Sequence, residues 1–579
     1  MTPDARVASR PRGVPRARDL RAGAAIALVA AAAAIAALAA VAFLATGGVR
    51  GRIAGIPFSV RGLRKPLQAT LLLAAAGALV SPEIVLRAAT RVDALSARAR
   101  AGVAWGFAAI ATAAIAAAKV LQHRLFQTSA FDLGLQANVA WNTAHGRPFF
   151  DDLQGLNYLG DHFSPIHLAL AALYRLWPDA EMLLVLQAAA VGIALVVLVR
   201  IAERHLGSCA AALAVAAAFA LNPYLNSVSN FDFHPIALAI PIFLWLLDRV
   251  EVGGLASLAL LAALAATVEE TLVPPLVGVG AYLALVRRDL RRAGLALAGL
   301  ALLLFALELT VLMPYFLGAD RHTHVWRYDN LGGDTLPAIA RTVMANPLVL
   351  VREWLTPVGK PIALASLLAS FAFAPLLAPR EWILLAIPVL ALQLCRFEPQ
   401  WTFWEQYSAI VLPFCAFASV HGIARLRRAV APAGAIRRRL RAPSAFSAVR
   451  LGAVAFGLLL LGEVASSPPY VTPWSRERVA AARELVSRIP PPASVCAAQY
   501  LVPHLAGRAH IAMFQPRADG DADLEGAQFV LVDEGADAWG AWPFTPEENA
   551  AAIARLRSDR RYRLVEEREG LLLFRLRRW

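Results

Sequence analysis

Long apolar segments alternate with shorter polar stretches along most of the chain. Each segment is dominated by Ala, Leu and Val and approaches the roughly 20 residues with which an α-helix crosses a bilayer. Outer-membrane barrels show short alternating strands instead. The pattern therefore predicts an all-α polytopic membrane domain with about 11–13 transmembrane helices. The apolar segments are 23–46, 67–86, 103–121, 181–199, 208–223, 235–248, 254–268, 271–286, 293–316, 361–378, 381–395, 408–424 and 451–466.

Composition and charge agree with a membrane protein. The 579 residues are 58% hydrophobic and 17% charged, with a mean hydropathy of +0.56, which is more apolar than a soluble globular protein. The net charge is +15, but most arginines stand in short loops beside apolar segments, where they mark the cytoplasmic side. The charge therefore does not indicate a nucleic-acid partner. Abundant Ala, with Arg far exceeding Lys, is typical of a GC-rich bacterial genome, so the predicted location is the bacterial inner membrane.

The arginine distribution also predicts orientation. With a cytoplasmic N-terminus and alternating spans, most basic loops lie inside, including the strongly basic block 425–450. The basic loop 47–66 falls outside, so the first two spans fit this topology least well. The stretches 122–180 and 317–360 and the tail 467–579 then lie on the extracytoplasmic side. The unusual polar residues of the chain gather on that face.

The tail has a different pattern from the rest of the chain. RERVAAARELVSRI and EENAAAIARLRSD have helical spacing, whereas QFVLVDE and the final YRLVEEREGLLLFRLR predict strands and a hairpin. No Gly-rich phosphate loop occurs in the tail. We therefore predict three regions: 1–100 with two extra helices, the transmembrane domain 101–466, and a small extracytoplasmic α/β domain, 467–579, that covers or gates the membrane part.

Ionisable side chains stand just outside several apolar segments. Asp132, in FDLG, follows the third segment, where an acid suggests function but where Asp is also a good helix N-cap; both interpretations stay open. Asp161 and His162 occur in GDHFSPIH, and Asp232 and His234 in FDFHP. Boundary capping or interfacial polarity is the alternative for each of these pairs.

Glu269 and Glu270 interrupt an otherwise apolar stretch. Each acid costs roughly 2–3 kcal/mol in a membrane span, so we favour function here and expect at least one carboxylate to face a polar cavity. Arg321 and Arg327, in DRHTHVWRYDN, could hold a phosphate through charge-assisted hydrogen bonds. Tyr407 ends the aromatic-rich CRFEPQWTFWEQY, whose rings by default form an interfacial belt.

Together these motifs resemble a family of bacterial multi-pass membrane proteins of unknown function. The matching positions are Phe131-Asp132-Leu133-Gly134, His162-Phe163-Ser164-Pro165, His234-Pro235 and Glu269-Glu270. A basic residue often precedes the acid pair in that family, and here Val268 takes its place, so an ion pair from that position is absent. The resemblance covers about residues 105–579.

That family is in turn similar to the GT-C glycosyltransferases, membrane enzymes that take a sugar from a polyprenyl-phosphate lipid on the outer face. Their first large external loop carries an acidic residue near the end of a span, and Asp132 matches that place. The resemblance implies a GT-C-like transmembrane domain, a polyprenyl-phosphate-linked sugar donor in the bilayer, and an envelope glycan or protein as acceptor.

Sugar transfer supplies roles for these residues. A carboxylate can deprotonate the acceptor hydroxyl, and the leaving lipid phosphate needs Arg, His or a divalent cation such as Mg²⁺ or Mn²⁺. Asp132 and Asp161 are the candidate ligands for such a cation. The predicted catalytic residues are Asp132, His162, His234 and Glu269, and the predicted substrate-binding residues are Asp161, Glu270, Asp232, Arg321, Arg327 and Tyr407.

Two other functions compete with the glycosyltransferase. A lipid or solute transporter or flippase needs polar groups near the bilayer midplane and a path to both faces, whereas the acids here are placed at the outer edge. A non-catalytic scaffold would use the membrane domain and the tail to bind envelope partners. The sequence leaves both alternatives open.

Overall fold

The structure of the protein is a computed structural model, and it falls into two compact units. One unit comprises residues 1–100 and 430–468, and the other comprises 101–429 and 469–579. In the first unit the described elements are the hairpin β1 (Val49–Ile53) and β2 (Ile56–Val60) and the helix α3 (Pro82–Asp93). The structure describes residues 49–53, 56–60, 76–318, 324–333, 335–430, 474–517, 522–524 and 526–577, with the single positions Ala27 and Ala34.

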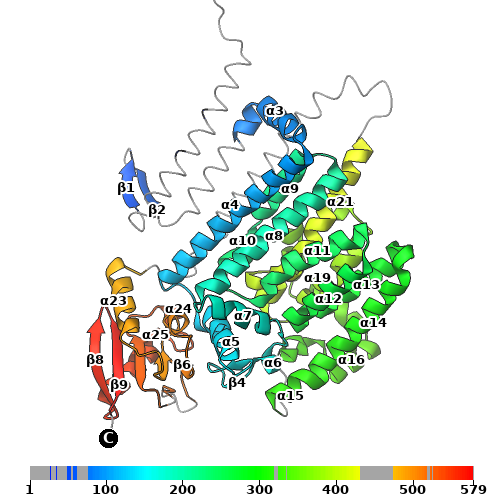
Figure 1. Cartoon of the computed structure of the whole chain (residues 1–579). Coiled ribbons are helices and arrows are strands. Elements are labelled where there is room, and N and C mark those ends of the chain that lie inside the picture. Colours follow the sequence, from blue (N-terminus) through cyan, green and yellow to red (C-terminus); the bar gives the residue numbers. More distant parts are fainter. Residues whose placement is uncertain are drawn as a thin grey trace, which may run out of the picture. The chain divides into compact units, whose positions relative to one another are not determined.

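The second unit contains a large helical part, in which α4, α8 and α21 are the long ribbons of Figure 1. Its first half consists of α4 (Ala97–Arg124), η1 (Ala130–Gly134), α5 (Leu135–Ala144), β3 (Phe150–Asp151), β4 (Leu156–Asn157), α6 (Tyr158–Asp161), α7 (His167–Leu176), α8 (Glu181–Leu206), α9 (Cys209–Ala220), α10 (Pro223–Asn230), η2 (Pro235–Leu238), α11 (Ala239–Val252) and α12 (Leu255–Val268). Its second half consists of η3 (Glu270–Leu272), α13 (Val273–Val286), η4 (Arg288–Leu290), α14 (Arg291–Leu307), η5 (Glu308–Leu312), α15 (Met313–Leu317), η6 (Val325–Leu331), α16 (Leu336–Ala345), α17 (Leu348–Leu355), α18 (Gly359–Ala369), η7 (Ala374–Leu377), α19 (Trp382–Gln393), α20 (Glu398–Trp401), η8 (Glu405–Ile410) and α21 (Leu412–Val430).

Ten of the thirteen predicted apolar segments coincide with these helices. Segment 451–466 lies outside the described residues, 23–46 lies outside them apart from Ala27 and Ala34, and 67–86 is described only from residue 76. Within the described part, three helices are long and apolar enough to cross a membrane, at Ala97–Arg124, Glu181–Leu206 and Arg288–Leu317. Two bent pairs, α9 with α10 and α20–η8 with α21, could each form one further span. Several predicted spans, among them α12, are shorter: a helix of 14 residues is about 21 Å long, less than the roughly 30 Å hydrocarbon core.

Local sequence explains where these helices break. Asn222 accepts hydrogen bonds from the N–H groups of Tyr224 and Leu225, and Pro223 occupies the first turn, so the chain starts a new helix there at 56° to α9. Glu269 adopts an extended conformation, with φ −170° and ψ 148°, and ends α12. The predicted apolar segments 208–223, 254–268 and 271–286 end or begin at these two breaks.

Small residues bring the helices together. A Cβ added to Gly280 of α13 would lie 2.6 Å from the carbonyl oxygen of Gly294 in α14, and a Cβ on Gly294 would meet Gly280 in the same way. A Cβ on Gly192 of α8 would collide with Thr112 of α4. Close backbone approach at small residues is how helices pack in a bilayer, where lipid removes the hydrophobic drive for association.

The C-terminal α/β domain holds a five-stranded sheet of order β6-β5-β7-β9-β8. The central strand β7 pairs in parallel with β5 and antiparallel with β9, and all five of its residues are buried. Glu569 and Gly570 both have positive φ, as the tight turn between β8 and β9 requires. The domain consists of α23 (Arg476–Ser487), β5 (Val495–Ala497), η10 (Val502–His504), β6 (Ile511–Met513), β7 (Phe529–Asp533), α24 (Ala538–Ala541), α25 (Pro546–Ser558), β8 (Tyr562–Arg568) and β9 (Leu571–Leu576).

The predicted fold class is confirmed. The chain is mostly helical, and strands and helices alternate in a small C-terminal domain, where the tail sequence predicts them. The final hairpin and the helices α23 and α25 coincide with the predicted segments.

Candidate functional site

Asp132 lies in η1, a short π-helix that stands directly before α5. Its Oδ2 accepts a short hydrogen bond from the hydroxyl of Ser129, and its Oδ1 lies 3.3 Å from Nε2 of His234. The residue before α5 is Gly134, and no side chain caps this helix. The capping interpretation of Asp132 is therefore wrong, because the extra residue of the π-turn places the carboxylate toward His234. About a quarter of the Asp132 side chain is exposed, so it can meet a substrate.

A buried ion pair supports this carboxylate from behind. Lys119 of α4 is 1% exposed, and its ammonium lies 3.3 Å from Oδ1 of Asp232. The same ammonium donates to the carbonyl oxygen of Asn230 at 2.8 Å and to Gln122 at 2.9 Å. The other oxygen of Asp232 accepts the backbone N–H of Ser129 at 2.7 Å. Asp232 therefore fixes the segment that presents Asp132, instead of facing a substrate as predicted.

His162 lies between the two glutamates that break the apolar pattern. Its Nδ1 is 3.0 Å from Oε1 of Glu270 and 3.6 Å from Oε1 of Glu269. Glu270 also accepts the N–H of Phe163 at 3.0 Å, and Glu269 accepts the hydroxyl of Thr271 at 2.7 Å. Burial lowers the pKa of His162, but the two carboxylates outweigh it and raise the pKa to about 10. His162 is therefore a cation at neutral pH.

Asp161 pairs with His324, a residue of the DRHTHVWRYDN stretch. Its Oδ1 lies 3.2 Å from Nε2 of His324, and the His324 ring stacks on His162 with centroids 4.5 Å apart. Burial raises the pKa of Asp161, but the two histidines lower it further, well below its usual range. His324 instead has a lowered pKa because it is buried beside the His162 cation. Asp161, His162 and His324 thus form a cluster of one carboxylate and two imidazoles.

Two sets of side chains here have the donor atoms of a metal site. Asp161, His162 and His324 form one set, and His162, Glu269 and Glu270 form the other, with ligand atoms within 4.8 Å of one another in each set. Asp132 and Asp161, the predicted ligand pair, are engaged by different histidines. The geometry therefore favours a ligand set around His162 over the predicted pair.

Arg327 and Tyr407 are both predicted substrate-binding residues, and they lie next to each other. The guanidinium Nη1 lies 3.5 Å from the Tyr407 hydroxyl and 3.4 Å from the amide oxygen of Gln400. The same guanidinium packs over the Phe397 ring at 4.8 Å. Its buried Nε has no partner within the described residues. Arg321 lies outside the described residues.

Electrostatic contacts join these groups into one region. Glu269 is close enough to interact with His234, the partner of Asp132, and with Tyr407. Glu405, which follows the aromatic CRFEPQWTFW stretch, interacts in the same way with Asp132. The predicted catalytic residues Asp132, His162, His234 and Glu269 therefore lie near one another, together with residues from η6 and η8.

The C-terminal domain packs directly against the segment that carries Asp132. A Cβ on Gly134 would lie 3.0 Å from Val502. Asn138 of α5 donates hydrogen bonds of 3.0 and 3.1 Å to the carbonyl oxygens of Ala506 and Arg508. The ring of Phe131 meets the edge of Trp542 at 5.6 Å. The domain thus contacts the FDLG motif, which contains Asp132, and the helix that follows it.

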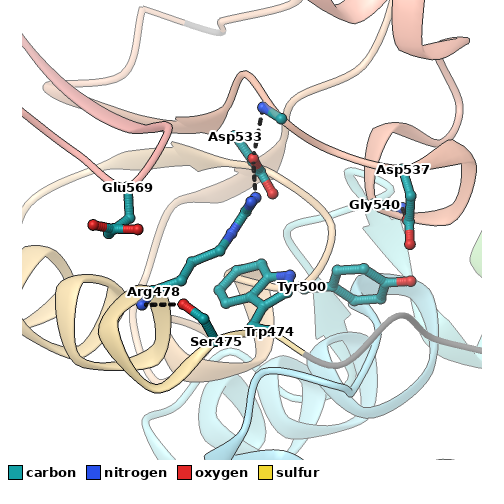
Figure 2. Close-up of a pocket in the computed structure, with 9 residues that line it drawn as sticks. Trp474, Ser475, Arg478, Tyr500, Asp533, Asp537, Gly540 and Glu569 are labelled. Atoms are coloured by element: carbon teal, nitrogen blue, oxygen red, sulfur yellow. Dashed lines mark hydrogen bonds and ion pairs between the residues drawn. The ribbon is translucent and has the colours of Figure 1, made fainter.

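A separate pocket of about 270 Å³ lies in the C-terminal domain, as Figure 2 shows. Arg478 forms an ion pair with Asp533 and covers one face of Trp474 at 4.7 Å, while Phe126 stacks near the same indole at 5.4 Å. The Trp474 indole therefore packs between Arg478 and Phe126. The lining residues are Trp474, Ser475, Arg478, Tyr500, Asp533, Gly535, Asp537, Gly540 and Glu569, none of which is a predicted site residue.

Sequence reasoning missed Lys119, Ser129 and Glu405 as parts of the site, and it placed His324 only in the DRHTHVWRYDN group that could hold a phosphate. Lys119 carried a usable signal, because an ionisable residue inside an apolar segment is a functional candidate by default. His324 and Glu405 stand in stretches already noted, but nothing in their spacing indicates which member faces Asp161 or Asp132.

The long apolar helices and the buried ionisable groups between them define a polytopic membrane protein. The chain belongs to the family described as Predicted membrane protein (DUF2079), whose model matches residues 122–573. This finding confirms the resemblance that the FDLG, HFSP, HP and EE motifs indicate.

The structure is similar to two solved structures of ArnT from Cupriavidus metallidurans. The first, bound to undecaprenyl phosphate, is 13% identical, with a TM-score of 0.43, and the match covers 81% of this chain and 98% of that chain. The second, in the apo state, is 12% identical, with a TM-score of 0.41, and the match covers 76% of this chain and 93% of that chain. No curated protein matches the sequence.

Proposed function

We propose that this membrane protein is a glycosyltransferase that moves a sugar from a polyprenyl-phosphate donor to an envelope glycan or protein acceptor. The observation that carries the proposal is the pairing of Asp132 with His234 in a region that also holds the Arg327 guanidinium and the His162 cation. A general base and a set of positive groups for a leaving phosphate are the two requirements of this reaction. The proposed setting is the extracytoplasmic face of the bacterial inner membrane, with a cytoplasmic N-terminus.

In the proposed reaction, Asp132 accepts the proton of the acceptor hydroxyl. The hydroxyl oxygen attacks the anomeric carbon of the sugar, and the bond from that carbon to the phosphate oxygen breaks, so that the lipid phosphate leaves with the electron pair. Ser129 and His234 orient the carboxylate of Asp132. Arg327 and the His162 cation offer positive charge for the phosphate.

The proposal includes a divalent cation only at the cluster around His162, whose side chains would be its ligands. An ion bound there would replace the second proton of His162, and Asp161, neutral His162 and His324 would then supply one carboxylate and two imidazoles. This donor set is better suited to a transition ion than to Mg²⁺, which prefers oxygen ligands. Of the two predicted ions, Mn²⁺ fits these residues better. Such an ion would add positive charge where the leaving phosphate collects.

A reconstituted transfer assay tests this function. The purified full-length protein is offered a panel of polyprenyl-phosphate sugars, and release of lipid phosphate is measured for the wild type, D132N and the control D179N. Asp179 accepts a hydrogen bond from the backbone N–H of Glu181 and has no role in the proposed chemistry. We expect release by the wild type and D179N but not by D132N.

Other outcomes would favour the alternatives. Binding and movement of a lipid between leaflets without release of lipid phosphate would favour the transporter or flippase. Neither binding nor release with any donor, with a folded protein, would favour a scaffold.

A further inference from the structure

A second histidine–carboxylate cluster lies at the C-terminal end of α8, far from Asp132. Nε2 of His205 and Nε2 of His421 lie 2.6 and 2.8 Å from the same oxygen, Oε1 of Glu251. The three residues come from α8, α11 and α21, and each side chain is less than a quarter exposed. We call His205, Glu251, His421 and the neighbouring Glu381 the His421 cluster.

The donor atoms of this cluster are those of a transition-metal site. Two imidazole nitrogens and one carboxylate oxygen lie within 4.8 Å of one another. Two His and one Glu are a known ligand set for Zn²⁺, and imidazole nitrogen is a favoured ligand of the late divalent transition metals. The three donors come from different helices, so an ion bound there would join the helices.

The groups around these donors form an independent observation. Nδ1 of His421 lies 3.3 Å from Oε1 of Glu381, a carboxylate that is 3% exposed. Arg204 donates to the second oxygen of Glu251, Oε2, at 2.5 Å, which directs Oε1 toward the imidazoles. A carboxylate behind the remote nitrogen of a histidine, and a donor on the free oxygen of a ligating carboxylate, are the contacts that orient metal ligands.

The arginines beside the cluster pair with nearby carboxylates. Arg204 and Arg249 both contact Asp248, which is 1% exposed, and Arg425 pairs with Glu381 at 3.1 Å. Oε1 of Glu251 is therefore left for the two imidazoles.

We propose that His205, His421 and Glu251 bind a divalent transition-metal ion such as Zn²⁺, with Glu381 as a positioning residue for His421. The ion joins α8, α11 and α21 at one end of the helical part. Gln187, whose amide oxygen lies 3.3 Å from the N–H of His234, precedes His205 by 18 residues in the same helix. That spacing is about 27 Å along the axis. The proposed ion is therefore structural and separate from the Asp132 site.

Metal binding by the full-length protein in detergent is the direct test. The protein is stripped with a chelator and titrated with Co²⁺ and Zn²⁺, and bound metal and the Co²⁺ absorption spectrum are recorded. Variants H205A and H421A remove one ligand each. H324A removes a histidine of the Asp161 cluster, and H145A removes an exposed histidine whose ring stacks on Trp141.

We expect H205A and H421A each to bind one ion fewer per chain than the wild type and to lose one Co²⁺ absorption component. H145A should match the wild type, and any change in H324A should affect a different component. E381Q keeps all three ligands and should bind this ion about 10–100-fold more weakly. Zn²⁺ should raise the melting temperature of the wild type and of H324A, but not that of H421A.

Two results would overturn the proposal. One is a wild type that binds no Co²⁺ or Zn²⁺ beyond the ion lost in H324A. The other is equal metal content in the wild type, H205A, H421A and E381Q. Either result would make the cluster a set of direct imidazole–carboxylate hydrogen bonds.

Discussion

The two ends of α8 carry similar chemistry in different surroundings. Near its first turns, Asp132, His234, His162, Glu269 and Glu270 face one another beside the C-terminal domain. Near its last turn, the His421 cluster is surrounded by the arginines of α8, α11 and α21. At the first end the acids outnumber fixed cations, whereas at the second each acid has an arginine or two imidazoles as partners.

This difference shows which charged residues of a membrane protein can be recognised as functional from the sequence. At the Asp132 end, acids interrupt apolar sequence and stand out. At the other end, the positive-inside rule already explains Arg200, Arg204 and the arginines after Val286, so the acids that pair with them attract no notice. The same residue types thus give a strong signal in one loop and none in another.

The largest expected effect concerns the buried ion pair behind Asp132. Replacing Lys119 with Met leaves the Asp232 carboxylate buried without its cation, and we expect the free energy of unfolding to fall by about 3–5 kcal/mol. Denaturant unfolding of the detergent-solubilised protein measures this change. The double variant K119M/D232N should recover part of the loss, because no charge is then stranded.

Lys360 offers a matched control for this prediction. It is also 1% exposed, but its ammonium donates to a backbone carbonyl, that of Glu353, at 2.8 Å. K360M should therefore cost clearly less than K119M. Equal losses in the two variants would contradict the special role of the Lys119–Asp232 pair.

Much of the fold could be predicted from the sequence, because apolar length and periodicity are local properties. They locate α4, α8 and α21 and the strands of the tail. The gap between the apolar segments 254–268 and 271–286 predicts the break at Glu269. The π-turn at Asp132 could not be predicted, since the segment around it is held by a contact between Ser129 and Asp232, more than 100 positions away. For the same reason the motifs identify which residues gather at the Asp132 site but not which of them touch.

The next effect is a pH dependence of the free energy of unfolding that is caused by the titration of His162. Its pKa is about 10 in the folded protein and about 6.5 when unfolded, so its contribution is complete below pH 6.5 and is lost as the pH rises through 10. The free energy of unfolding should fall by up to a few kcal/mol across this window. In H162Q this part of the slope should disappear.

Unfolding midpoints at pH 6, 8 and 10 measure this slope. His167 is a useful comparison, because burial lowers its pKa to about 4, so its contribution is lost only as the pH falls from about 6.5 through 4. H167Q should therefore change the slope below pH 6.5 and leave the alkaline window as in the wild type. An unchanged alkaline slope in H162Q would show that the two glutamates do not hold the His162 proton.

A smaller effect is expected from the partner of Asp132. His234 orients the proposed base without being consumed by the reaction, so H234Q should lower kcat by about 10–100-fold and change KM little. Transfer kinetics of H234Q, D132N and the double variant measure this. The two changes should not be additive, because the residues act as one unit. A further drop of the same factor in the double variant would mean that His234 acts independently of Asp132.

The smallest effect compares ion pairs at the two ends of α8. Arg124 pairs with Glu181 at 2.6 Å at the first end, but its side chain is 60% exposed, so R124Q should cost no more than about 1 kcal/mol of unfolding free energy. R204Q at the other end should cost more, because it removes a contact from Asp248, which is 1% exposed. The R124Q loss should also shrink in high salt, which screens exposed charges, while the R204Q loss should persist. Denaturant unfolding at low and high salt measures both, and a larger loss in R124Q would mean that the exposed end of α8 is held more tightly by charge than the buried one.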